Sequence, residues 1–299
     1  LGPRVKGYNR KVLIDSKLQK PLYSVRRVKQ LCKWVTSMHV WSSPITIQNL
    51  HSELCSGVLL CRIMQVVVPG TQFLHLNEKA LSKKPALENL ENGLGVIWRS
   101  KCVNNSRVPA AIDIFTGNAS KIAIMLQEVF EVYVQRPLYK IAPKMFNWYD
   151  SILRQYSRSL PREIFTEGNL AGLWSHFQSG FAIFCILYHL HGNVTVGEGA
   201  SAVRIDSMRI YADPSNIVEF RSNITYIFSI LAALNIEVIW DLQDWISYAD
   251  TEFVVLQLFY IYEVLQSRQC SLPPAQGTSA GVTSGANGEP QVTGMIYAD

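Results

Sequence analysis

Hydrophobic residues recur along most of this 299-residue chain at steps of three and four, the spacing that places them on one face of an α-helix. Four such stripes run through residues 25–38, 87–98, 146–156 and 217–234. Strand-like runs are confined to residues 65–69 and 193–196, where short β-branched stretches lie beside Gly or Pro. The pattern predicts an all-α protein.

Helix breakers and composition divide the chain into five segments. Pro137 and Pro143 bracket a short connection after a helix that ends near Gln135, because proline cannot continue a helix without losing a hydrogen bond. Beyond residue 267 the chain is rich in Gly, Ser, Thr, Ala and Pro, a composition that predicts a flexible tail or linker. We therefore expect a basic arm at 1–22, a first domain at 23–136, a linker at 137–143, a second domain at 144–267 and the tail at 268–299.

The two predicted domains resemble copies of one another. Each opens with a tryptophan-bearing helix, around Trp34 and Trp148, and each continues through a Ser-Gly pair into an apolar helix. Each also closes on an Asp-led turn into a last helix, and the two closing segments, 113–135 and 244–266, align without a gap. The agreement in order and type predicts an internal duplication at the scale of whole domains.

Charge is concentrated at the start of the chain. Residues 1–33 carry ten Lys or Arg against one acid, a net charge of +9, although the whole chain has a formal net charge of only +5. Two interpretations stay open: a solvated arm, or an electrostatic contact for an acidic partner such as a filament, a nucleic acid or an anionic membrane.

The six cysteines are scattered and form no CxxC pair, which favours a reducing compartment and a cytoplasmic protein. The longest apolar run, residues 181–190, is about half of what a membrane span needs, so we expect a soluble protein. The chain begins at Leu1 without a Met, and we interpret it as a fragment of something larger.

Four stretches of the first domain carry a family resemblance: KW at 33–34, LHSELCSGVLL at 50–60, ALENLENGL at 86–94 and DIFTGN at 113–118. Together they resemble a calponin-homology domain of the fimbrin-like, actin-binding type. The second domain resembles the partner domain of such a tandem pair more weakly, through FQSGFAIF and DLQDWISYAD. The resemblance implies two helical bundles that bind a cytoskeletal filament and catalyse no reaction.

Three departures from the family pattern bear on the partner. Ser56 and Ser179 stand where the family has an Asp before Gly, and Pro109 interrupts the loop before Asp113. The second domain also carries an additional polar stretch at residues 192–213. The choice between F-actin and microtubules, including the axonemal proteins of cilia and flagella, therefore stays open.

By resemblance, basic residues on three surfaces would meet the filament. These are Arg26, Arg27, Lys29 and Lys33 on the first helix, Arg107 and Lys121 around the last helix of the first domain, and Lys144 on the first helix of the second domain. For Arg154 and Arg158, on the same helix as Lys144, we favour a solvated face. Binding through exposed charges should weaken as salt rises.

Other functions have weaker support in the sequence. Cys185, His189 and His191 lie close together but lack a fourth zinc ligand, and we find no nucleophile motif, paired carboxylates or phosphate loop. We therefore expect no enzyme activity, cofactor or metal. The alternative is a scaffold within a cytoskeletal or ciliary assembly that touches no filament. Nucleic-acid binding has little support, and anionic-lipid binding by residues 1–33 ranks last because that segment lacks an amphipathic stripe.

Overall fold

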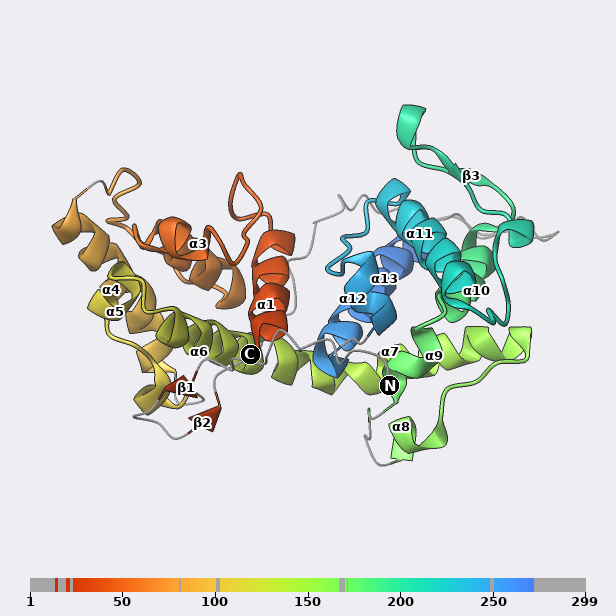
Figure 1. Ribbon diagram of the computed structural model, residues 1–299, viewed down its shortest axis with the longest axis horizontal. Helices are drawn as coiled ribbons and strands as arrows, with labels where there is room; N and C mark the ends of the chain where they lie inside the picture. Colours follow the sequence, from red (N-terminus) through yellow and green to blue (C-terminus); the bar gives the residue numbers. More distant parts are fainter. Residues whose placement is uncertain are drawn as a thin grey trace, which may run out of the picture. The chain divides into compact units, whose positions relative to one another are not determined.

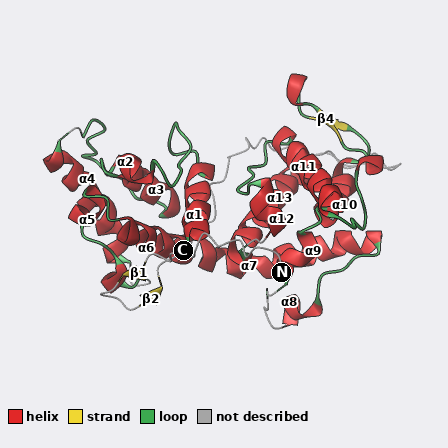
Figure 2. Cartoon of the chain, viewed as in Figure 1, coloured by secondary structure: helices red, strands yellow, loops and turns green. Residues whose placement is uncertain are grey.

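The computed structural model describes residues 14–15, 20–21, 24–80, 82–100, 103–166, 170, 172–247 and 250–271 (Figure 1). Within this part of the chain, helices joined by loops make up nearly all of the regular structure, and the strands are two residues long (Figure 2). The all-α prediction is confirmed. The chain divides into two compact units between Lys140 and Ile141, called unit 1 and unit 2 below.

Unit 1 is a bundle of helices with short connections. Its elements are β1 (Ile14–Asp15), β2 (Lys20–Pro21), α1 (Val25–Ser37), α2 (Leu50–Leu54), α3 (Val58–Val67), α4 (Lys83–Arg99), η1 (Asn105–Arg107), α5 (Ala111–Phe115), α6 (Ala119–Phe130) and the π-helix η2 (Glu131–Gln135). Trp34 of α1 is buried against Phe130 of α6, with ring centroids 5.2 Å apart in an edge-to-face arrangement. The tryptophan predicted to mark the first helix is thus part of the core.

Unit 2 contains the same kinds of helix with additional short elements. After α7 (Arg136–Leu153) come η3 (Arg154–Tyr156), α8 (Arg162–Thr166), α9 (Leu173–Phe177), α10 (Phe181–His191), β3 (Thr195–Val196), η4 (Gly199–Ser201), β4 (Val203–Arg204), η5 (Ser207–Arg209), α11 (Ile217–Ala233), α12 (Leu242–Ser247) and α13 (Thr251–Ser271). The antiparallel hairpin β3–β4 lies in the polar stretch at 192–213 and projects from α10 and α11 (Figure 1).

The prediction that the helix breaks at residues 137–143 is wrong, because α7 runs through this segment, although the division between the two units falls inside it. Pro137 falls in the first turn of α7, where a missing N–H costs little. Pro143 lies inside the helix, yet the apolar residues around it, Ala142, Met145 and Phe146, are buried. Their packing outweighs the loss of one backbone hydrogen bond.

Two further predicted boundaries differ from those in the structure. Residues 65–67 belong to α3 and not to a strand, because Val67 is fully buried on the inner face of that helix. The helix α13 continues to Ser271, past the predicted start of the tail at 268. The rest of the tail, and the basic arm apart from β1 and β2, lie outside the described residues.

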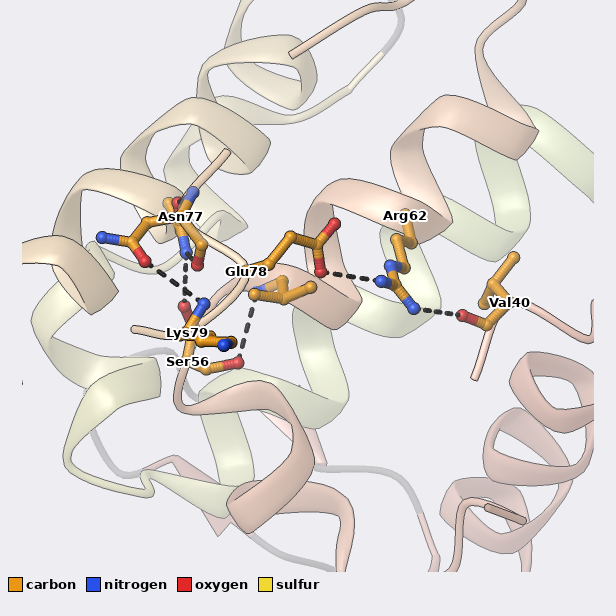
Figure 3. Close-up of polar contacts among 8 residues, drawn as sticks. Val40, Ser56, Arg62, Asn77, Glu78 and Lys79 are labelled. Carbon is orange, nitrogen blue, oxygen red and sulfur yellow. Dashed lines mark hydrogen bonds and ion pairs between the residues drawn. The ribbon is translucent and has the colours of Figure 1, made fainter. Parts of the chain in front are cut away.

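A buried asparagine links three segments of unit 1. Asn89 of α4 donates from Nδ2 to the backbone carbonyls of Ser56 and Asn77, at 3.0 and 2.9 Å, and its Oδ1 accepts the N–H of Asn77 at 3.0 Å. Ser56 and Asn77 lie close together in Figure 3. Gly57 follows in the left-handed conformation, with φ of 76°, and a Cβ there would lie 2.5 Å from the backbone of Leu90. The Asn89 amide therefore fixes the turn before α3 and the loop before α4.

Unit 2 repeats this arrangement around Asn223 of α11. Its Nδ2 donates to the carbonyls of Ser179 and Tyr211, at 3.0 and 2.8 Å, and its Oδ1 accepts the N–H of Tyr211 at 2.9 Å. Gly180 is left-handed like Gly57, with φ of 78°. We call the two clusters the asparagine clamps, of Asn89 in unit 1 and Asn223 in unit 2.

Candidate functional site

The Asp-led turn before α6 is held by polar contacts on both of its sides. Asp113 lies in the first turn of α5, where Oδ2 accepts the N–H of Ala110 at 3.1 Å. Asn118 caps α6 by accepting the N–H of Lys121. Gly117 between them has φ of 79°, and a Cβ there would lie 2.9 Å from the ring of His51. The carboxylate thus caps the short helix α5, and the asparagine caps the long one.

Three of the predicted filament-binding residues also hold unit 1 together. The first is Lys121, whose Nζ lies 2.8 Å from Asp113 Oδ2. This ion pair is partly exposed, so it screens the lysine charge without removing the side chain from the surface. Lys121 therefore connects α6 to the turn that precedes it.

The second is Arg107, at the end of η1, which forms an ion pair with Glu128 of α6. The Glu128 side chain is buried, and this burial raises the pKa of its carboxyl, while the Arg107 guanidinium opposes the shift. Because a buried carboxylate needs a counter-charge, Arg107 stabilises unit 1 by pairing with Glu128, a role that the sequence did not predict.

The third is Arg27 of α1. Its Nε donates to Oε1 of the buried Gln127 at 2.8 Å, and its guanidinium lies over the Phe130 ring, 5.6 Å from the centroid. Gln127 in turn donates to Glu131 Oε1 at 2.7 Å. Arg27 thus contributes to the packing of α1 against α6.

The remaining predicted residues lie on the outer surfaces of the helices. Arg26, Lys29 and Lys33 are half-buried on α1, and Lys144 is exposed on α7. Arg154 and Arg158, for which a solvated face was favoured, both form ion pairs: Arg154 with Asp150 at 2.6 Å and Arg158 with Asp213 at 2.6 Å. The candidates on α1 and near α6 all belong to unit 1, whereas Lys144 belongs to unit 2.

A second polar cluster of unit 1 was not predicted. Arg62 of α3 pairs with Glu78 at 2.7 Å, and its other guanidinium nitrogen faces the carbonyl of Val40 (Figure 3). The guanidinium lies 5.2 Å from the ring centroid of Trp41, whose Nε1 donates to Glu53 Oε2 at 2.7 Å. The available signal was the single charge in the apolar sequence of α3.

Three of the cysteines, Cys32, Cys61 and Cys185, are buried in the cores. Burial raises the pKa of the Cys32 and Cys61 thiols to about 12 and that of Cys185 to about 11, so all three stay protonated at neutral pH. His189 is exposed while Cys185 is buried, and in the described ranges no three His, Cys, Asp or Glu side chains gather as metal ligands would. Among the helices that the structure describes, none is long and apolar enough to cross a membrane.

Residues 26–135 match the family model of the calponin homology (CH) domain. The match spans α1 to η2 and so covers the helical body of unit 1, which confirms the resemblance there. Domains of this family commonly mediate binding to actin or other parts of the cytoskeleton, or act as scaffolds, and are typically non-catalytic. No curated protein matches the chain.

Proposed function

We propose that the chain is a non-catalytic interaction module of the cytoplasmic cytoskeleton, in which a tandem pair of calponin-homology bundles docks a larger protein onto a filament. The observation that carries the tandem pair is the clamp of Asn223, which makes the same three hydrogen bonds as the clamp of Asn89. Unit 1 is the part that matches the family, and the shared internal geometry supports the proposal that unit 2 is of the same type.

The order of elements supports the same duplication. In each unit a first helix leads through one short α-helix in unit 1 and two in unit 2 to a Ser-Gly turn. An apolar helix, a long helix with the clamp asparagine, a short helix and a last helix follow in both. Both Ser-Gly turns place the serine Oγ as acceptor for an N–H of the following helix, Val58 in unit 1 and Phe181 in unit 2, each at 3.3 Å. This serine takes the role of the family's Asp without its charge.

The proposed filament contact uses basic residues on the outer surfaces of the first helices. Arg26, Lys29 and Lys33 on α1 form one contact, and Lys144 on α7 forms another. Arg27, Arg107 and Lys121 are also engaged in bonds within unit 1, to Gln127, Glu128 and Asp113. Exposed cations attract an acidic filament over about 8–10 Å at ordinary ionic strength, so affinity should fall steeply with added salt.

F-actin is the first filament to test, because the family commonly binds actin. The experiment is cosedimentation of the full chain with F-actin and, separately, with microtubules, at low and at high salt. We expect salt-sensitive pelleting with F-actin. Pelleting with microtubules alone would reassign the module to microtubules or axonemes, and pelleting with neither would overturn the filament function.

Charge reversal locates the contact. Lys144→Glu, and separately the triple reversal of Arg26, Lys29 and Lys33, should each lower filament affinity at least several-fold. Arg27 is kept, because its loss would disturb the α1–α6 packing. The matched control is Lys84→Glu: Lys84 is exposed at the start of α4 and forms no ion pair with any described residue. Equal loss in the control would indicate a nonspecific charge effect.

A scaffold that touches no filament is the second candidate, and one observation favours it. The stretch 192–213 is tied to α11 through the Tyr226 hydroxyl, which accepts the N–H of Asp206 at 2.7 Å and donates to the Arg204 carbonyl at 2.6 Å. Although it is held in this way, the stretch exposes Met208 and Tyr211, with 90% and 49% of their surface accessible. A scaffold would pellet with filaments only in the presence of its partner. Vesicle flotation tests the lipid alternative.

A further inference from the structure

A pocket of about 310 Å³ opens in unit 2. Its lining is largely apolar, with Leu160, Phe181 and Phe220 among the larger side chains, and its polar residues include Arg158, Ser159 and His176. Its volume is at the small end of ligand sites, which suits one large side chain better than a cofactor. None of the predicted filament-binding residues lines it.

Neighbouring groups hold the guanidinium of Arg158 in place at the pocket. Arg158 donates to Asp213 Oδ1 at 2.6 Å and to the carbonyl of Ala212 at 3.4 Å. Its guanidinium also lies 5.2 Å from the centroid of the Phe181 ring, in the geometry of a cation–π contact. The Asp213 side chain is 83% accessible, so the ion pair is held weakly and can be exchanged for another carboxylate.

Unit 1 shows what fills the equivalent space. The first helix of each unit is followed by a non-glycine residue in the left-handed conformation, His39 with φ of 53° and Ser157 with φ of 56°. Counting on from these residues, Trp41 of unit 1 corresponds to Ser159 of unit 2. Counting back from the two Ser-Gly turns, Glu53 corresponds to His176. Both unit 2 counterparts line the pocket.

In unit 1 the partly buried side chain of Trp41 occupies the corresponding position. Its Nε1 donates to Glu53 Oε2 at 2.7 Å, and Arg62 covers its ring. Glu78, which pairs with Arg62, is the residue after Asn77 of the Asn89 clamp. The residue at the corresponding position of unit 2, after Tyr211 of the Asn223 clamp, is Ala212, which lines the pocket. With serine in place of the tryptophan, unit 2 lacks the side chain that occupies this position in unit 1, while the counterparts of Glu53 and Glu78, His176 and Ala212, line an open pocket.

We infer that the unit 2 pocket binds a tryptophan side chain that a partner protein presents next to an acidic residue. The indole would take the place that Trp41 has in unit 1, with its N–H directed at His176. The neighbouring carboxylate would pair with Arg158 in place of Asp213. The apolar lining would remove the indole from water, which supplies most of the affinity.

The chemistry of His176 fits the role of acceptor. Partial burial lowers the pKa of its imidazole, so the ring is neutral at pH 7. A neutral imidazole has one nitrogen with a free lone pair, which can accept an indole N–H as the Glu53 carboxylate does in unit 1. Arg158 then provides the charge complementarity for the acidic neighbour.

The test is a titration of the full chain with N-acetyl-tryptophanamide, followed through the NMR signals of the His176 imidazole. We expect saturable shifts with the tryptophan probe and weaker, non-saturating ones with N-acetyl-leucinamide. A probe with an aspartate next to the tryptophan should bind about two- to fivefold more tightly, the range of an exposed ion pair. No saturable shift, or equal binding of the leucine probe, would overturn the inference.

Ser159→Trp supplies the matching variant. The new indole should fill the pocket from within, as Trp41 does in unit 1, so probe binding should be lost while the Tm stays at or above that of the wild type. The control, Ser151→Trp, alters an exposed serine of α7 outside the pocket and should bind the probe normally. Retained binding in a folded Ser159→Trp variant would contradict the assignment. The wild-type titration decides the matter even if that variant fails to fold.

Discussion

Replacing Asn223 by alanine should destabilise unit 2 to a degree that the clamp geometry allows us to estimate. The asparagine is fully buried, and its amide makes three hydrogen bonds, two to Tyr211 and one to Ser179. A hydrogen bond of this kind contributes about 1 kcal/mol net, so three contribute about 3 kcal/mol. Because Tyr211 is partly exposed, water can replace some of its backbone bonds. We therefore expect a loss of about 2–3 kcal/mol.

The assay is equilibrium urea unfolding, together with calorimetry to resolve the transitions of the two units. A loss of 2–3 kcal/mol should lower the Tm of the affected unit by about 5–10 °C. Asn89→Ala should cost unit 1 a similar amount, because the Asn89 clamp has the same bonds. Asn147→Ala, at an exposed position of α7, is the control and should change stability by less than about 0.5 kcal/mol.

A chemical variant separates hydrogen bonding from packing. Asn223→Asp places a carboxylate oxygen against the two carbonyls that the Nδ2 group now serves, so at pH 7 it should cost more than alanine does. Only the protonated carboxyl can donate to a carbonyl, so its folded-state pKa would be raised. Stability should therefore return as pH falls and disappear as pH rises through that pKa. A cost below about 0.5 kcal/mol for Asn223→Ala, or no pH dependence for the Asp variant, would refute the reasoning.

Three further predictions concern the turns and the buried charges. Gly57→Ala should lower the urea midpoint more than Gly180→Ala, because an added Cβ meets α4 backbone in the first case and the ends of isoleucine side chains in the second; equal losses would contradict this. Burial raises the pKa of Glu263 to about 7, so wild-type stability should fall between pH 4.5 and 7, and unfolding of Glu263→Gln at several pH values should lack that slope. Arg107→Gln should cost about 3 kcal/mol in urea unfolding by leaving buried Glu128 without its counter-charge, and adding Glu128→Gln should recover part of it; no recovery would count against the pair.

The sequence shows which basic residues are candidates for a filament contact, but it does not show the bonds that three of them make inside unit 1. Arg27, Arg107 and Lys121 are visible in the sequence as basic residues, but each pairs with a residue of another element: Gln127, Glu128 and Asp113, respectively. A pattern of exposed and buried positions says which side of a helix faces the core. It does not say which polar group from another helix meets it there.

The pocket of unit 2 also could not be predicted from the sequence. Ser159 and His176 are ordinary polar residues in the sequence, and no local motif connects them. They become a site only because the Asn223 clamp and the left-handed Ser157 bring α9, the start of α10 and the end of the first helix together. Comparison with Trp41 of unit 1 then shows which side chain is missing.

The sequence by itself determined the helical class, the approximate positions of the helices, the Ser-Gly turns and the Asp-led turn of unit 1. All of these follow from spacing and residue chemistry within a few positions along the chain. The tertiary structure alone decided that α7 continues through Pro143, that three predicted contact residues are engaged internally, and that unit 2 keeps an open pocket. These outcomes depend on packing and hydrogen bonding between segments far apart in sequence, where the free energy of burial outweighs local preference.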